Sequence, residues 1–352
     1  MIHFEEQFSM IDVEGQSIYK LWSAIDNELV ALHEDVLNNI FIDIDYYAIV
    51  GLCPRFMRDG GLSGESAINQ ATFEKWVKRN DNYLTNKFLY YHDVESLVSS
   101  VQNRFSIIAE MLDRLFVKIS PRLPVNLLSC DGVLHSRDVE IHSILNSIII
   151  NVSSCCDILT KLAFELENIN SIKFDKYPKL YSKDILYVAS KRLPETLKVD
   201  GSIFAPTRPK VIQQFDSLRN EIVHNGSLDF DYRVYYGQKE ENYYTWVMIP
   251  DFDSRGLFTT YNNRKKFYSD SNKTFNTELP LMIKNFFRLS KTTILNLRQN
   301  YSHERYESQT DVEKYIKDII NWYQSYSNIL CGKGDVTGVT KELSANNNSP
   351  SK

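Results

Sequence analysis

Residues 137–169, RDVEIHSILNSIIINVSSCCDILTKLAFELENI, decide the fold. Apolar side chains recur here at the three- and four-residue spacing of an α-helix, and around Ile148 they cover most of the helix circumference. A helix that is apolar on nearly every side is buried by its neighbours. The stretch therefore predicts a long helix at the centre of a helical bundle.

Amphipathic patterns on both sides of this stretch predict the helices that surround it. One apolar stripe runs through residues 17–40 and another through 94–119, where Pro121 ends the helix because proline lacks the amide donor. Later patterns predict helices at 183–193, 210–224, 279–299 and 311–329. After residue 224, Asn225-Gly226 supplies a left-handed C-terminal cap.

The residue pattern changes from helical to strand-like near residue 230. Aromatic and β-branched residues in 230–236 and 243–249 flank a polar stretch, which predicts a β-hairpin, and 257–261 is a candidate third strand. We therefore expect a mainly α fold, a helical bundle with a small β-hairpin insertion near 230–261.

The prolines at 121 and 124 mark the expected domain boundary. We expect an additional N-terminal helical region over 1–125, with a regulatory or sensing role, and the helical bundle over 130–330. Residues 332–352 are polar and poor in apolar side chains, which predicts a flexible tail.

The composition limits the class of protein. Hydrophobic residues make up 43% and charged residues 24%, as in ordinary globular proteins, and the formal net charge of −5 excludes a chain coated in positive charge. No uninterrupted apolar run reaches the roughly 20 residues of a membrane span, and the acidic N-terminus lacks the pattern of a secretory signal. The five cysteines are scattered and form no disulfide framework. We expect a reduced, soluble, cytoplasmic protein that makes no membrane contact.

The string that indicates chemistry is SLRNEIVHNG, residues 217–226. Arg219 is followed directly by Asn220 and, five residues after the arginine, by His224, at the end of an amphipathic helix. The string resembles the R-N-x-x-x-H signature of the HEPN superfamily. The resemblance implies a four- or five-helix bundle and a metal-independent ribonuclease of the kind found in antiviral defence, abortive infection and toxin–antitoxin systems.

The resemblance also implies a mechanism and partners. The ribose 2′-hydroxyl of RNA attacks the adjacent phosphorus, Arg219 stabilises the charge on the phosphate oxygens, and His224 relays a proton. The products carry 2′,3′-cyclic phosphate and 5′-hydroxyl ends. Since the chain has one convincing motif, a homodimer with a composite site is implied, and an antitoxin or another defence-system protein is the further partner. Neither a metal nor a cofactor is expected, and the sequence contains no H-E-x-x-H pattern, no Cys/His ligand spacing and no phosphate loop.

The central helix supplies the residues expected to support the motif, Asp157, Thr160 and Lys161. A carboxylate in an apolar helix is costly unless it is paired. Asp157 therefore either orients the motif or pairs with Lys161 four residues later.

Structural roles for the motif residues stay open at this point. Arg219 is either catalytic or paired with a neighbouring acid, Asp216 or Glu221, and His224 then only caps the helix. The spacing R-x-x-x-x-H also occurs at Arg137–His142 and at Arg298–His303. The asparagine after Arg219 and the Asn-Gly that stops its helix favour the copy at 219–224.

Basic and aromatic residues interleave between Arg264 and Lys291, where seven basic residues stand against two acidic ones. Cations neutralise the RNA backbone and aromatic rings stack on bases. We expect RNA contacts from Arg264, Lys265, Lys266, Lys284 and Arg288. A second basic stretch runs from Lys173 to Arg192, and both stretches also fit an ordinary solvated surface.

A different class of function also fits the motif helix. Some HEPN proteins are non-catalytic interaction or scaffold modules, whose polar cleft binds a partner protein or a nucleotide. Because a fold does not by itself determine an activity, this alternative stays open beside the ribonuclease.

Overall fold

The computed structural model describes residues 4–38, 83–119, 136–176, 179–226, 233–239, 242–268 and 273–301, with a few isolated residues besides. The helix expected at 311–329, the tail at 332–352, and Cys53, Cys130 and Cys331 lie outside the described residues.

The chain divides into two compact units. The first comprises residues 1–32, 97–168 and 181–301, and the second comprises 33–96, 169–180 and 302–352. Helices α1 (Phe4–Asn38) and α5 (Tyr83–Ile119) each contribute to both units. Parts of both N-terminal helices thus belong to the first unit, and the domain boundary near residue 125 stays a prediction.

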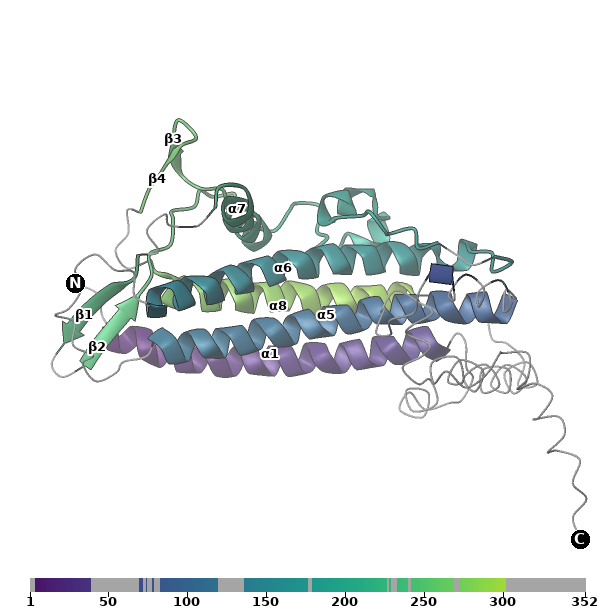
Figure 1. Ribbon diagram of the computed structural model, residues 1–352, viewed down its shortest axis with the longest axis horizontal. Coiled ribbons are helices and arrows are strands. Elements are labelled where there is room, and N and C mark those ends of the chain that lie inside the picture. The colour runs from purple at the N-terminus through teal and green to yellow at the C-terminus, as the bar shows by residue number, and fades with distance from the viewer. Residues whose placement is uncertain are drawn as a thin grey trace, which may run out of the picture. The chain divides into compact units, whose positions relative to one another are not determined.

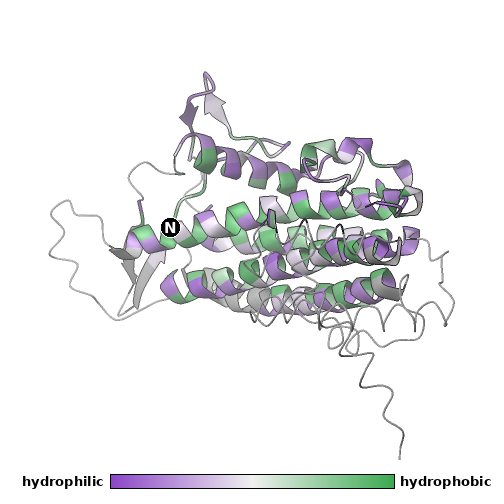
Figure 2. Ribbon diagram, turned by 45° about the vertical axis from the view of Figure 1, so that its right-hand side comes forward, coloured by the Kyte–Doolittle hydropathy of each residue, from purple (hydrophilic) through white to green (hydrophobic). Residues whose placement is uncertain are grey.

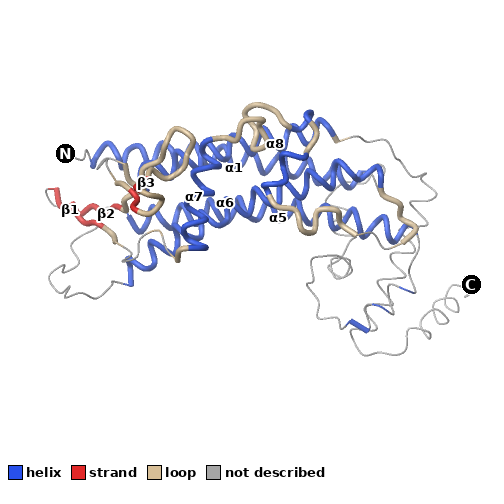
Figure 3. The backbone as a smooth tube through the Cα atoms, turned by 90° about the horizontal axis from the view of Figure 1, so that it is seen from above, coloured by secondary structure: helices blue, strands red, loops and turns tan. Residues whose placement is uncertain are grey.

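A bundle forms the first unit, which is mainly helical as predicted. Helices α6 (Ser136–Asn168) and α8 (Phe275–Asn300) run alongside the first-unit parts of α1 and α5 (Figures 1 and 3). Hydrophobic and hydrophilic residues alternate along these helices in bands, the pattern of amphipathic helices around a shared core (Figure 2). Side-chain hydrogen bonds join neighbouring helices: Gln102 to Asp26, Arg104 to Asn151 and Arg298 to Glu28.

The central helix predicted at 137–169 is confirmed as α6. Its apolar residues Leu145, Ile148, Ile149 and Val152 have no exposed surface. By length and composition α6 is apolar enough to cross a membrane, but more than half of its most apolar window is buried inside the protein. A helix at the core of a bundle is buried in this way.

Helix α7 (Lys210–His224) has the bounds predicted from the sequence. It packs on α6 and α8 through Val211, Ile212, Phe215 and Leu218. The Phe215 ring lies 6.2 Å from that of Phe286 on α8. The helix ends as predicted, since Gly226 has a φ of +102°, a backbone conformation that favours glycine.

The short helix predicted at 183–193 is confirmed only over its second half. This segment forms a short 3-10 helix, η3 (Tyr187–Arg192), followed by η4 (Glu195–Leu197). Tyr187 and Leu193 are buried, whereas Leu186 and Val188 are 54% and 72% exposed. Because no continuous apolar face is covered, packing does not stabilise an α-helix here.

The predicted hairpin is confirmed, with its strands shifted into the polar stretch. Strand β1 (Tyr235–Lys239) pairs antiparallel with β2 (Asn242–Trp246), so that Tyr235 lies opposite Trp246. Of the third predicted strand, only Thr260 and Tyr261 form a strand, β3, which pairs with β4 (Lys265–Lys266).

An aromatic cluster forms part of the described core of the second unit, beside buried aliphatic residues such as Val36, Leu89 and Val94. Tyr83, Tyr90 and Tyr91 of α5 surround Phe174, with ring centroids 5.8 to 6.1 Å from it. Asn86 donates a hydrogen bond to the Phe174 carbonyl at 3.1 Å. A short 3-10 helix, η2 (Ile169–Ser171), precedes this segment.

Candidate functional site

Asn220 and His224 lie on the exposed side of α7, and Arg219 lies at its half-buried edge. An α-helix turns about 100° per residue, so Asn220 and His224 lie about 100° and 140° round the helix from Arg219, and Val223 lies about 40° from it. Asn220, Val223 and His224 are exposed and Arg219 is half-buried. We call these four residues, Arg219, Asn220, Val223 and His224, the motif arc.

The acids beside the motif arc are paired with other cations. Asp216 forms an ion pair with Arg208, and Glu221 forms one with Lys266 at 2.5 Å. The structure therefore places neither acid on Arg219. The Arg219 guanidinium donates to the Asn220 side-chain oxygen at 3.1 Å, and His224 has no hydrogen-bond or ion-pair partner among the described residues.

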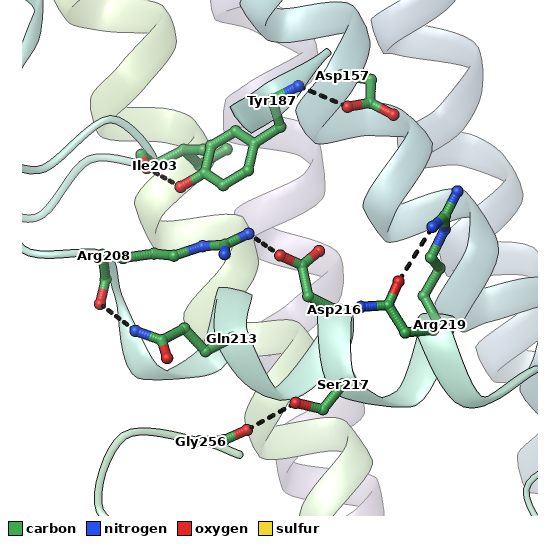
Figure 4. A network of polar contacts seen from close by, with 10 residues as sticks. Asp157, Tyr187, Ile203, Arg208, Gln213, Asp216, Ser217, Arg219 and Gly256 are labelled. Atoms are coloured by element: carbon green, nitrogen blue, oxygen red, sulfur yellow. Dashed lines mark hydrogen bonds and ion pairs between the residues drawn. The ribbon is translucent and has the colours of Figure 1, made fainter. Parts of the chain in front are cut away.

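A polar network around Arg208 holds the first half of α7 in place (Figure 4). Arg208 reaches Asp216 on α7 and lies 5.0 Å from the centroid of the Tyr187 ring. The Tyr187 hydroxyl donates to the Ile203 carbonyl at 2.7 Å, and burial raises the pKa of Tyr187 above its ordinary value. Tyr187 is therefore a neutral structural donor, and Figure 4 shows Arg219 extending from α7 away from this network.

The residues expected to support the motif make other contacts. Asp157 accepts a hydrogen bond from the Tyr187 backbone amide at 2.7 Å, at the start of η3. Thr160 donates to the Cys156 carbonyl and Lys161 donates to the Lys183 carbonyl. The described contacts thus place none of the three on Arg219 or His224, and Asp157 does not pair with Lys161.

The copy of the spacing at Arg137–His142 has a structural role. His142 is 1% exposed, and its Nε2 lies 3.2 Å from the Arg233 carbonyl oxygen. Asp138 accepts a hydrogen bond from the Tyr236 hydroxyl. These contacts join the start of α6 to the segment that leads into β1. The side chain of Arg137 and the whole of His303 lie outside the described residues.

Cys155 and Cys156 are buried in α6 and are not disulfide-bonded. Burial raises the pKa of both thiols above the ordinary value. Both therefore stay protonated at neutral pH and offer no thiolate nucleophile. Among the residues that the structure describes, no group of three or more His, Cys, Asp or Glu side chains is arranged to hold a metal ion.

The basic stretch predicted to contact RNA is divided between two elements. Arg264 and Lys265 are exposed on the β3–β4 hairpin, while Lys284 and Arg288 lie on α8. Lys266 turns toward α7, where it pairs with Glu221. This contact was missed in the sequence, because 45 residues separate the partners and no local pattern connects them.

The motif arc presents a guanidinium, a carboxamide and an imidazole on one exposed helix surface. A guanidinium offers fixed donors to phosphate oxygens, and an imidazole can take up or release a proton at physiological pH. These are the kinds of group that bind a phosphate and transfer a proton beside it. Comparison of the chain with protein-family models, curated proteins and solved structures found no match.

Proposed function

We propose that the chain is a metal-independent endoribonuclease of HEPN type, acting in antiviral defence, abortive infection or toxin–antitoxin stress response. One observation carries the proposal. Asn220 and His224 are exposed on α7 and Arg219 is partly exposed beside them, while Asp216 and Glu221 are paired with Arg208 and Lys266. The arginine and histidine of the motif therefore remain available to a ligand.

The reaction that suits these groups is attack of a ribose 2′-hydroxyl on the adjacent phosphorus. His224 accepts the 2′-hydroxyl proton and returns it to the departing 5′-oxygen. Arg219 donates hydrogen bonds to the phosphate oxygens, where negative charge grows in the transition state. The Asn220 side chain accepts a hydrogen bond from Arg219 and so holds the guanidinium on the side of α7 where Asn220 lies.

A second copy of the chain is part of the proposal. Arg219 and His224 lie about 140° apart around α7 and about 7.5 Å apart along it. A phosphate that lies against one helix is therefore poorly placed to contact both side chains. Two α7 helices related by a two-fold axis bring the arginine of one copy toward the histidine of the other. Val223 supports this arrangement, because it is an apolar side chain, 48% exposed, at the centre of the motif arc.

Val223→Asp is expected to convert a dimer into a monomer and to abolish RNA cleavage without lowering the melting temperature. The reason is that the side chain is exposed in one copy and is buried only by the second, where an unpaired carboxylate is costly. Sedimentation velocity and a cleavage assay measure the two effects. Val117→Asp on α5, a site 57% exposed, is the matched control and should change neither. A dimeric, fully active Val223→Asp protein contradicts the composite site.

The chemistry of the cleaved ends tests the proposed function. Purified protein is incubated with single-stranded RNA in excess chelator, and the products are separated and their ends identified. We expect 2′,3′-cyclic phosphate and 5′-hydroxyl ends, and no cleavage at a nucleotide whose 2′-hydroxyl is replaced by hydrogen, because that hydroxyl is the nucleophile.

Two outcomes overturn the proposal. Cleavage that stops when chelator is added, or that continues at a 2′-deoxy nucleotide, excludes the mechanism. A wild-type protein that is inert toward RNA, also in the presence of its cellular partner, favours the alternative of a non-catalytic HEPN interaction or scaffold module.

A further inference from the structure

Residues 251–267 form a small folded arm that follows the β1–β2 hairpin and precedes α8. Its backbone is closed by hydrogen bonds from Thr259 to Asp251, from Asp251 to Phe267 and from Phe267 to Thr259. The rings of Phe252 and Phe258 stack at 5.3 Å between these segments. The arm is therefore an ordered element and not a loose connection.

Two turns give the arm its shape. The Asp253 carboxylate accepts hydrogen bonds from the amides of Leu257 and Arg255, and these bonds lower the pKa of Asp253. At the tip, Asn262 and Asn263 have φ values of +51° and +54°. Asparagine is among the few non-glycine residues that adopt this conformation readily.

The arm is fastened to the motif helix at two points. Gly256 has a φ of +95° and lies so close to α7 that an added Cβ would be 2.6 Å from the Lys210 carbonyl oxygen. Ser217 of α7 donates to the Gly256 carbonyl at 3.2 Å, as Figure 4 shows. At the other end, Lys266 pairs with Glu221, next to Asn220, and lies over the Phe258 ring.

The pairing of β3 with β4 separates the two faces of the hairpin. Thr260 lies opposite Lys266, and Tyr261 lies opposite Lys265. Directly opposite residues share a face of the hairpin, and successive residues alternate. The face of Thr260 and Lys266 is half-buried toward α7, so Tyr261 and Lys265 point to solvent.

The outward face carries a ring and one cation, and the turn beside it carries a second cation, and the described residues neutralise neither cation. Tyr261 is 67% exposed, and Arg264 and Lys265 are also exposed. Among the described residues neither cation has an ion-pair partner, and residues 260–266 contain no acid. Figure 1 shows the β3–β4 hairpin standing out from the bundle beyond α7.

We propose that the arm binds single-stranded RNA, with Tyr261 stacking on a base and with Arg264 and Lys265 contacting phosphates on either side of it. A single exposed ring can stack only on a base that is not already stacked in a duplex, which selects single strands. Cations beside the ring supply the sequence-independent part of the affinity.

The position of the arm directs the strand toward the motif arc. Lys266 holds the hairpin to Glu221, which lies in the same turn of α7 as His224. RNA bound to the outward face is therefore held beside the end of α7. The claim that the arm directs RNA to the motif arc rests on the proposed ribonuclease function, whereas the claim that the arm binds RNA does not.

Binding is measured by fluorescence polarisation with a labelled 12-nucleotide 2′-O-methyl RNA, which cannot be cleaved, over a series of salt concentrations in excess chelator. Tyr261→Ala is expected to weaken binding about tenfold at unchanged salt dependence, because one stacked base is lost. Arg264→Gln with Lys265→Gln is expected to reduce the slope of log affinity against log salt by about 1.4, since each contact with a single strand contributes about 0.7.

Matched variants elsewhere on the protein serve as controls. Tyr19→Ala removes a tyrosine of α1 that is 64% exposed, and Lys20→Gln with Arg114→Gln removes two exposed cations of α1 and α5, all outside both basic stretches. Neither should change the affinity or the salt slope. Melting temperatures of all variants should equal that of wild type, because every substituted side chain is exposed.

The outcomes separate this inference from the proposed function. Four results overturn the arm as an RNA site: arm variants that bind like wild type, equal losses of affinity in the control variants, tighter binding to a duplex of the same length, and a wild type that does not bind RNA. If wild type does not bind RNA, the arm is a surface for a protein partner. Arm-dependent binding without cleavage overturns the ribonuclease alone. Cleavage that is unaffected by arm variants that bind RNA more weakly overturns only the claim that the arm directs the strand to the motif arc.

Discussion

Arg219→Ala is expected to lower the rate of RNA cleavage about 100- to 1,000-fold and to leave the melting temperature unchanged. The rate falls because the donors that stabilise charge on the phosphate are lost, and removal of one such donor from an active site has effects of this size. Stability is unaffected because the only hydrogen bond of this side chain among the described residues goes to its neighbour Asn220, on the surface.

His224→Ala is expected to cause a loss of about 100- to 10,000-fold, the usual contribution of a general acid or base. Arg219→Lys should lie between Arg219→Ala and wild type, since lysine keeps the charge but not the fork of donors. Arg192→Ala, at an exposed arginine on η3, is the matched control and should cleave like wild type. Single-turnover rates with saturating protein measure all four. If Arg219→Ala loses no more activity than Arg192→Ala, the motif is structural.

The largest effect on stability is expected from Phe286→Ala, which should lower the free energy of unfolding by about 3–5 kcal/mol. Phe286 has no exposed surface and contacts the rings of Phe105, Phe215 and Phe287, with centroids 5.7 to 6.2 Å away. This cluster joins α5, α7 and α8, so the variant leaves a cavity where the motif helix meets the bundle. A fall in melting temperature of roughly 10 °C is expected.

Two further variants make this prediction specific. Phe286→Leu fills most of the space and should cost much less than Phe286→Ala. Tyr261→Ala removes an exposed ring of similar size and should change the unfolding free energy by less than about 0.5 kcal/mol. Denaturant titration gives the three values. A Phe286→Ala protein as stable as Tyr261→Ala contradicts the packing of α7 on α8.

Patterns of apolar spacing and helix-end signals predicted the helices whose own residues carry those signals. The period of apolar residues in 137–169 identified the buried helix α6, and the pattern in 210–224 together with Asn225-Gly226 identified both ends of α7. The same reasoning did not predict that the helix at 183–193 is a short 3-10 helix, because apolar spacing alone does not show whether Leu186 and Val188 are buried.

Long-range contacts explain what the sequence did not reveal. Asp157 was expected either to orient the motif or to pair with Lys161, but its partner is the Tyr187 amide, 30 residues later in the chain. The arm depends on the approach of Gly256 to α7 and on the pair Lys266–Glu221. A turn signal was available in Asp253-Ser-Arg-Gly256 and in Asn262-Asn263, but neither indicates which helix the turn lies against.

The most direct test of the central claim, that the arginine and histidine at the end of α7 cleave RNA without metal, is a comparison in excess chelator. The cleavage rates of wild type, Arg219→Ala, His224→Ala and the double variant are measured on one single-stranded RNA. We predict that wild type cleaves, and that the double variant is no slower than the slower single variant, because groups that act on one transition state lose their effect together. A double variant that cleaves like wild type, or a wild type that is inert in chelator and active with a divalent metal ion, contradicts the account.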